Sequence, residues 1–371
     1  MKRRLLAVLL CAVMALSLGA CGDSNKDDTQ KDSNKDVKQP SITELAEYKD
    51  FAKILTGTYE VTDAKVNAYF SNVVYSAGIG VVEVKDRDTV QKGDIVKTDY
   101  KGYLNDVAFE GGSATDQWID VTNNCGINTS TGESSGGYID GFTDGLVGAK
   151  VGEKTSSEVT FPDKYGNTDL AGKKTTFEFT VKAIYAEVTP ETITDTMVKE
   201  TFEKSYEVST VADFMQVMKK ELAYNLLVNY VIEKSTFDIP EEYLNARLEE
   251  YQKLFTELYC TQMDIETYLK YYYGTTLDAM KAQWASALQS QIKAELVFEA
   301  IVKDANLKTD EKELSDYVAT IMTTAGTMEG NDFFAKEDNI YKMLGVGNVD
   351  AGKNYFLNQE AVRDYVIENY Q

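Results

Sequence analysis

The alternation of hydrophobic and polar positions divides the folded part of the chain into three stretches. In residues 46–90, hydrophobic side chains recur at helical spacing after Thr62, which predicts an amphipathic helix in a short lead-in that packs on a neighbouring part. Residues 91–187 change to period two, as in Phe177, Phe179 and Val181, and frequent glycines separate the runs. This pattern predicts a compact antiparallel sheet, with one short helix over residues 140–146 closed by Gly148. The hydrophobic positions of the lead-in helix are Val66, Tyr69, Phe70, Val73 and Val74.

Residues 188–371 have helical periodicity throughout, with Pro190 at the boundary. Thr210 and Asp213 are spaced as a capping box, and Pro240 precedes an acidic first turn, as at a helix start. The whole chain is therefore predicted to be α+β, with its strands in one block and its helices in another. The helical hydrophobic stripes are Leu244, Leu248, Tyr251, Phe255 and Leu258; then Leu277, Met280, Trp284, Leu288, Ile292 and Leu296; then Val362, Tyr365 and Val366.

The N-terminus reads as an export signal rather than as part of the fold. Residues 2–4 are basic, and an apolar run from Leu5 to Leu18 is too short for a membrane-spanning helix. The run ends in Leu18-Gly19-Ala20-Cys21, which resembles the bacterial lipobox and implies cleavage after residue 20 and lipidation of Cys21. Residues 21–45 are then expected to form a polar, disordered tether to the membrane.

Composition removes several kinds of chemistry from consideration. The chain of 371 residues has no histidine, which excludes Ser-His-Asp and Cys-His catalysis and histidine-ligated metals. Its formal charge of −22 argues against nucleic-acid binding. No metal-ligand spacing is present, so neither a metal nor a cofactor is expected. Outside the signal and Cys21, the cysteines are Cys125 and Cys260, for which a disulfide is permitted but not implied.

Several motifs in the middle stretch resemble FKBP-type peptidyl-prolyl isomerases, most closely the one inside trigger factor. They are Lys92-Gly93-Asp94, Asp99-Tyr100-Lys101-Gly102, Ala108-Phe109-Glu110-Gly111-Gly112, Ile139-Asp140-Gly141-Phe142 through Gly148, and Val159 through Tyr165. The resemblance continues on both sides, from Glu60-Val61-Thr62-Asp63 to the C-terminal helix, and covers about residues 45–371. Trigger factor's ribosome-binding domain has no counterpart here, so no ribosome is expected as a partner.

This resemblance implies a prolyl isomerase site made of aromatic side chains. Rotation of a prolyl bond needs no nucleophile or base, only a dry pocket that favours the twisted amide. Plain core packing would equally explain each aromatic residue taken alone. By motif position, the catalytic residues are expected to be Tyr100, Phe109, Glu110, Phe142 and Tyr165, and the substrate-binding residues Tyr138, Ile139, Leu170 and Phe179.

The sequence therefore predicts a foldase with a helical chaperone domain, held by lipid on the extracytoplasmic face of a cell membrane. Its expected partners are unfolded or nascent exported polypeptides with X-Pro bonds. Two alternatives remain open: a holding chaperone whose isomerase site is inactive, and a solute-binding lipoprotein. Residues 123–137 are longer than the corresponding trigger factor loop, and they form either a flexible rim of the site or an inert insertion.

Overall fold

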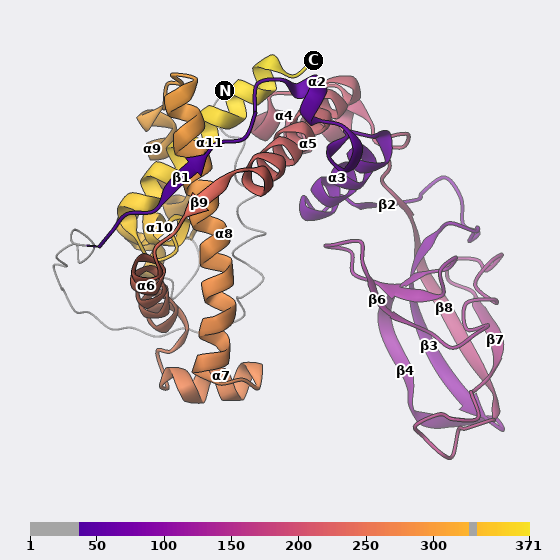
Figure 1. The fold of residues 1–371 in the computed structure, drawn as a ribbon. Coiled ribbons are helices and arrows are strands. Elements are labelled where there is room, and N and C mark those ends of the chain that lie inside the picture. Colours follow the sequence, from indigo (N-terminus) through magenta and orange to yellow (C-terminus); the bar gives the residue numbers. More distant parts are fainter. Residues whose placement is uncertain (1–36, 326–331) are drawn as a thin grey trace. The chain divides into compact units, whose positions relative to one another are not determined.

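The computed structural model of the chain describes residues 37–325 and 332–371 (Figure 1). The predicted export signal, Cys21 and most of the predicted tether lie outside these residues. The described chain divides into two compact units. The sheet unit comprises Asp63–Glu203 and Glu207–Met215, and the helical unit comprises the chain up to Thr62, Lys204–Tyr206 and Gln216–Gln371. Among the described residues, no helix is long and apolar enough to cross a membrane.

The sheet unit contains a seven-stranded antiparallel sheet, which confirms the strand block predicted for the middle stretch. Its strands follow the order β2-β8-β3-β4-β5-β6, and β7 also pairs with β8. The strands are β2 (Val81–Glu83), β3 (Ile95–Leu104), β4 (Val107–Asp120), β5 (Cys125–Ile127), β6 (Ser134–Gly137), β7 (Lys154–Thr160) and β8 (Lys174–Glu187).

Strand β8 supplies one face of the core through the alternation seen in the sequence. Phe177, Phe179 and Val181 are buried on that face, and the residues between them are not. The pairing of β3 with β8 shifts between Lys97 and Thr98, so that Ile184 rather than residue 183 is the next buried position. A bulge of this kind shifts by one residue which positions of the strand face the core. The alternation in the sequence alone could not predict this shift.

The predicted lead-in helix is α3 (Asp63–Ser76), and its hydrophobic stripe packs on a neighbour as expected. Phe70 is fully buried and lies edge-on to Phe214, with ring centroids 5.9 Å apart. Phe214 stacks in turn on Phe202 at 4.4 Å, from α4 (Asp195–Tyr206). These contacts hold α3 within the sheet unit.

The predicted short helix over residues 140–146 is instead a series of turns. Phe142 N–H donates to the Ile139 carbonyl, and Leu146 N–H donates to the Thr143 carbonyl, so the bonds span three residues rather than four. Gly141 has φ +82°, a left-handed conformation that interrupts helical propagation. The predicted helix was wrong in this detail, although the α+β class is confirmed.

Residues 188–371 are mainly helical, as predicted, although most of α4 and the first residues of α5 (Val211–Lys234) belong to the sheet unit. The cap at the start of α5 is present, because Thr210 Oγ1 accepts from Asp213 N–H at 3.1 Å. Pro240 is the N-cap of α6, whose first turn is acidic. Helix α8 packs against α6 and α11 (Figure 1). The helices are α5 (Val211–Lys234), α6 (Glu241–Tyr259), α7 (Ile265–Tyr273), α8 (Leu277–Asp304), α9 (Glu311–Ala325), α10 (Glu337–Leu344) and α11 (Val349–Asn369), with a 3₁₀ turn, η2, at Asp332–Ala335.

The N-terminal boundaries need two corrections. Strand β1 (Ser41–Glu44) pairs with β9 (Thr236–Asp238) in the helical unit, so the predicted tether over residues 21–45 extends too far. The segment that follows, with α2 (Phe51–Ile54) and the 3₁₀ turn η1 (Gly57–Tyr59), also belongs to the helical unit. The predicted lead-in over residues 46–90 is therefore divided between the two units after Thr62.

Candidate functional site

One end of the sheet unit's core is made of aromatic rings in mutual contact. They come from β3, β4 and β8, from the turns around residues 138–142, and from the segment after β7. Most of the expected site residues are among them, so the fold brings together side chains that are far apart in sequence. The rings are Tyr100, Phe109, Tyr138, Phe142, Phe161, Tyr165, Phe177 and Phe179.

Phe142 lies at the centre of this cluster with 2% of its surface exposed. Tyr138 stacks on it with centroids 4.3 Å apart and planes 12° apart, and Tyr100 meets it edge-on at 5.1 Å. Phe177 and Phe179 approach it from β8 at 4.8 and 5.0 Å. Phe142 is thus the buried centre of the cluster, surrounded by rings rather than by polar groups.

Phe109 occupies its place because two glycines make room for it. A Cβ on Gly102 would lie 2.5 Å from the Phe109 ring, and one on Gly112 would lie 2.3 Å from it. The ring is half-buried and meets Phe161 and Phe177 edge-on, at 6.0 and 5.7 Å. Glycine is thus required at both positions for a steric reason, because any larger residue would displace the Phe109 ring.

The remaining expected residues differ in exposure. Glu110 is exposed beside Phe109, and Tyr165 is 40% exposed with its ring 4.6 Å from Phe161. Leu170 is buried in the core, and Ile139 is half-buried against it. Tyr165 and Glu110 are therefore exposed to solvent, whereas Phe179 and Leu170, both expected to bind substrate, are buried in the core.

Among the expected site residues, only Glu110 carries a charge. Burial raises the pKa of Tyr100, and it raises the pKa of Tyr138 to about 12. Both phenols therefore remain protonated at neutral pH. The described residues contain no cluster of three or more potential metal ligands. Such an arrangement can desolvate an apolar ring, and the exposed Glu110 is the one expected site residue with a carboxylate.

Sequence reasoning did not assign Phe161 and Phe177 to the site. Phe177 touches the rings of Tyr100, Phe109 and Phe142, and it is as central as any expected residue. The alternation of hydrophobic and polar residues on β8 could have indicated Phe177, because Phe177 and Phe179 share one face of the strand. The period-two pattern identified them only as core positions.

The segment over residues 123–137 forms the hairpin of β5 and β6, which extends the sheet beyond β4. Cys125 in this hairpin and Cys260 in the helical unit are both free thiols. The two alternatives for residues 123–137, a flexible rim of the site and an inert insertion, both stay open.

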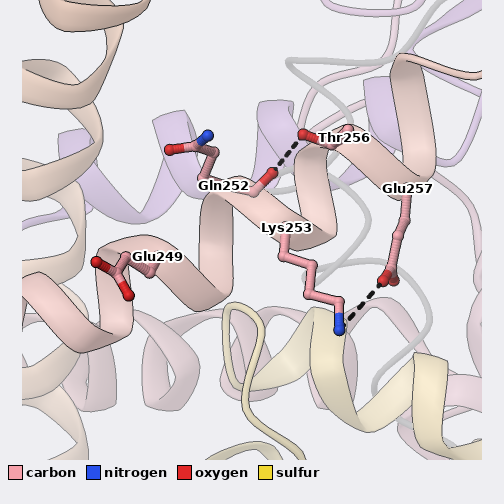
Figure 2. A pocket seen from close by; sticks show the side chains of 5 residues that line it. All are labelled: Glu249, Gln252, Lys253, Thr256 and Glu257. Atoms are coloured by element: carbon pink, nitrogen blue, oxygen red, sulfur yellow. Dashed lines mark hydrogen bonds and ion pairs between the residues drawn. The ribbon is translucent and has the colours of Figure 1, made fainter. Parts of the chain in front are cut away.

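A separate hollow lies along the exposed side of α6 (Figure 2). In it, Thr256 Oγ1 donates to the Gln252 carbonyl, and Lys253 is 4.0 Å from Glu257. These are ordinary contacts of a solvated helix face, with no aromatic ring among them. The lining residues are Glu249, Gln252, Lys253, Thr256 and Glu257.

Comparison with known proteins identifies both halves of the chain. Residues 86–184 match the family described as FKBP-type peptidyl-prolyl cis-trans isomerase, and residues 198–344 match the bacterial trigger factor C-terminus. This chain carries an FKBP-type domain followed by a trigger factor C-terminal domain. The first match ends within β8 and the second begins within α4, and the aromatic cluster lies within the FKBP-type match.

Curated relatives are trigger factors. The Clostridium beijerinckii protein is 32% identical over 284 residues, which are 73% of this chain and 62% of the relative. The Bacillus subtilis protein is 30% identical over 77% of this chain and 64% of the relative. A solved structure of the trigger factor chaperone aligns at 16% identity with a TM-score of 0.28, covering 91% of this chain and 81% of that one. The chain thus spans somewhat less than two thirds of these two curated relatives.

Proposed function

We propose that this protein is a membrane-anchored prolyl isomerase and chaperone that assists the folding of exported polypeptides. The observation that carries the isomerase part is the aromatic site, with Phe142 as its buried centre inside an FKBP-type domain. The partner proposed for this site is a polypeptide segment with an X-Pro bond. The ribosome is not proposed as a partner, because the N-terminal residues indicate export.

The chemistry suits a site without charged catalysts. Twisting a peptide bond loses C–N resonance and costs about 18–20 kcal/mol. Water favours the planar amide, which is the more polar form, so an apolar environment lowers the barrier to rotation. The absence of histidine from the whole sequence is no obstacle to this mechanism.

We assign roles by position in the cluster. Phe142 is the buried centre against which the rings of the prolyl site pack, and Tyr138, stacked on it, forms one wall together with Ile139. Phe109 forms the opposite side, and the exposed Tyr165 hydroxyl donates to a carbonyl of the substrate. Glu110 lies next to the twisting amide.

The experiment that tests the isomerase proposal is cis-to-trans conversion of a short X-Pro peptide, with the Phe142→Ala chain beside the wild type. We expect a clear acceleration by the wild type and a loss of about tenfold or more in the variant, because the buried centre of the prolyl site is removed. Tyr165→Ala changes a more exposed residue and should also slow the reaction without unfolding the domain. Val147→Ala, at a residue 52% exposed, is the matched control and should be neutral.

A folded wild-type chain without acceleration would leave the holding chaperone as the remaining function. One feature of the helical unit supports a chaperone in either case. Tyr271, Tyr272 and Tyr273 at the end of α7 are 77%, 56% and 38% exposed. Exposed aromatic patches of this kind suit adaptable contact with apolar segments of unfolded chains.

The membrane anchor rests on the sequence around Cys21, with its basic start, apolar run and small residues before the cysteine. We propose that lipid on Cys21 holds the protein at the extracytoplasmic face. Phase partition in detergent should place the wild type in the detergent phase and Cys21→Ala in the aqueous phase. Aqueous partition of the wild type, with an unmodified Cys21 by mass spectrometry, would disprove the anchor.

A further inference from the structure

The hairpin of β5 and β6 is fixed to the rest of the sheet unit at its tip. Tyr75 of α3 is 3% exposed, and its ring covers Gly132 between the two strands, where an added Cβ would lie 2.6 Å away. The same ring covers Gly80, and the Tyr75 hydroxyl donates to Glu187 at 3.4 Å. Tyr75 therefore links the tip of the hairpin to α3 and β8.

Its base is fixed by Asn124, which lies between β4 and β5. The Asn124 side-chain amide donates to the carbonyls of Tyr138 and Ile139, at 3.2 and 3.0 Å. The Asn124 carbonyl accepts from the Tyr138 N–H at 2.9 Å. Three hydrogen bonds thus join Asn124 to the two residues that follow β6.

The backbone before Asn124 is also constrained. Asp120 accepts from the N–H groups of Thr122 and Asn123, at 2.8 and 2.9 Å, so its side chain closes the turn. Asn124 itself has φ +49°, a conformation that asparagine and glycine tolerate better than other residues. This geometry directs both its carbonyl and its side chain toward residues 138 and 139.

We propose that Asn124 is a positioning residue for the prolyl site. It sets the place of the Tyr138–Ile139 wall, and through the 4.3 Å stack it sets the place of the Tyr138 ring over Phe142. Residues 138 and 139 lie outside any strand, so sheet pairing does not hold them. The inference rests on the proposed isomerase function, because it assigns the inserted hairpin to that same site.

Stability alone does not account for the Asn124 side chain. Its Oδ1 is buried, and no donor among the described residues reaches it. An unsatisfied buried acceptor costs free energy of the same order as the two amide hydrogen bonds provide. The net gain in stability is therefore small, whereas the geometric effect on residues 138 and 139 is direct.

The test compares two variants of the full-length chain. Asn124→Gly keeps the left-handed backbone and removes the side chain. Asn124→Asp keeps the shape and replaces the donating amide with an oxygen that faces two carbonyls. Asn306→Gly is the control, because Asn306 is exposed in the helical unit and has the same φ of +49°.

The readouts are kcat and KM for a tetrapeptide with one Leu-Pro bond, thermal unfolding, and hydrogen exchange of residues 138–142. We expect both Asn124 variants to raise KM about tenfold with kcat within a factor of about two, because a misplaced wall weakens binding before and during bond rotation alike. Exchange over residues 138–142 should increase in both variants. The midpoint of unfolding should stay near that of the wild type in Asn124→Gly and should fall in Asn124→Asp, whose new oxygen faces two carbonyls.

The outcomes distinguish a failure of the proposed isomerase function from a failure of the role assigned to Asn124. A wild type without isomerisation overturns the proposed function itself. A wild type that is active, with both Asn124 variants unchanged in KM and exchange, overturns only the role of Asn124. If activity falls in both variants only in proportion to a lower thermal stability, Asn124 is a structural residue. That result also overturns its positioning role.

Discussion

The side chain of Phe109 shows how the smallest residues define this site. Its ring lies between Gly102 on β3 and Gly112 on β4, each of which is close enough that a methyl group would overlap it. Gly112 has no left-handed φ, so the backbone there does not require glycine. The requirement is the space above it, which the ring fills.

We therefore expect Gly112→Ala to displace the Phe109 ring. The new methyl group would lie 2.3 Å from that ring, and a half-buried ring can rotate outward. Isomerisation of a prolyl peptide should fall about tenfold through the displaced side of the pocket. The free energy of unfolding, measured with urea, should fall by only about 1 kcal/mol, since the ring yields rather than the backbone.

Gly166→Ala is the control for this prediction. Gly166 is exposed, lacks a left-handed φ, and would present its methyl group to open space. Its activity and stability should match those of the wild type. Full activity in Gly112→Ala would show that the Phe109 ring does not form part of the site.

The sequence predicted the ring cluster at this scale, but not how its members are held. Motif positions brought Tyr100, Phe109 and Phe142 together correctly, because the resemblance fixes their order in the fold. Phe177 was identified only as a core position, since strand alternation gives a face and not its neighbours. Asn124 could not be found at all, because its partners are backbone carbonyls that leave no pattern in the sequence.

At the scale of elements, the sequence predicted the buried faces of helices better than it predicted where elements begin and end. The stripe of α8 is buried at Met280, Trp284, Leu288 and Ile292, as period 3.6 requires. Strand β1 was missed because Ser41–Glu44 is short and polar, and it is a strand only through its pairing with β9. The local sequence pattern could not predict this pairing, because the partner strand lies almost two hundred residues away.

Helix α11 carries a buried carboxylate that makes stability depend on pH. Glu360 is 5% exposed, one of its oxygens has no partner among the described residues, and the other is 3.8 Å from Arg363. Arg363 is already engaged by Glu221 of α5, with an N–O distance of 3.0 Å to one carboxylate oxygen. Glu313 of α9 and Asp364 of α11 add negative charge nearby, and burial above all raises the pKa of Glu360 to about 8.

We expect Glu360→Gln to stabilise the protein at pH 8. The unfolded chain releases this proton near its ordinary pKa of 4.5, whereas the folded chain retains it up to about 8. The wild type therefore loses stability as pH rises through this window, by roughly 2–4 kcal/mol at about 1.4 kcal/mol per pKa unit. The glutamine variant lacks this loss, so the difference should grow from nothing near pH 4 to its full value at pH 8.

The measurement is urea unfolding of the helical unit from pH 4 to pH 9, followed by far-ultraviolet circular dichroism. Glu368→Gln, on the exposed side of the same helix, is the control and should follow the wild type. A Glu360→Gln variant that is less stable at pH 8 would mean that Glu360 is ionised and stabilised by Arg363.

At the scale of the whole molecule, neither compact unit is a single continuous stretch of the sequence. The segment before Thr62 completes the helical unit, where Tyr48 and Ile54 are buried among residues of α5, α8 and α11. The sheet unit is thus an insertion between two parts of the helical one. The sequence alone predicted a separate helical lead-in over residues 46–90, whereas the structure divides this stretch between the two units after Thr62.

The exposed end of α7 lets the chaperone proposal be tested apart from the isomerase site. Asp264 caps the start of this helix by accepting from Thr267 N–H at 3.0 Å, and Gly274 ends it in the left-handed conformation. The helix is therefore held at both ends, and Tyr271 and Tyr272 are exposed with ring centroids 4.8 Å apart. Such rings are free to contact apolar segments of an unfolded chain.

We expect the double change Tyr271→Ser and Tyr272→Ser to weaken the suppression of aggregation of an unfolded client, measured by light scattering. The midpoint of inhibition should rise about fivefold, because most of the energy in such contacts comes from a few aromatic side chains. Stability should change by less than about 0.5 kcal/mol at these exposed positions. Turnover of a short prolyl peptide should be unchanged, since the aromatic site of the FKBP-type domain is intact.

Tyr271→Phe with Tyr272→Phe is the matched control, because it keeps both rings and removes only the hydroxyl groups. This variant should suppress aggregation as well as the wild type does. Equal suppression by the serine variant would show that unfolded chains bind elsewhere. Loss in both variants would assign the contact to the hydroxyl groups, and the surface would then recognise polar groups of the client rather than apolar segments.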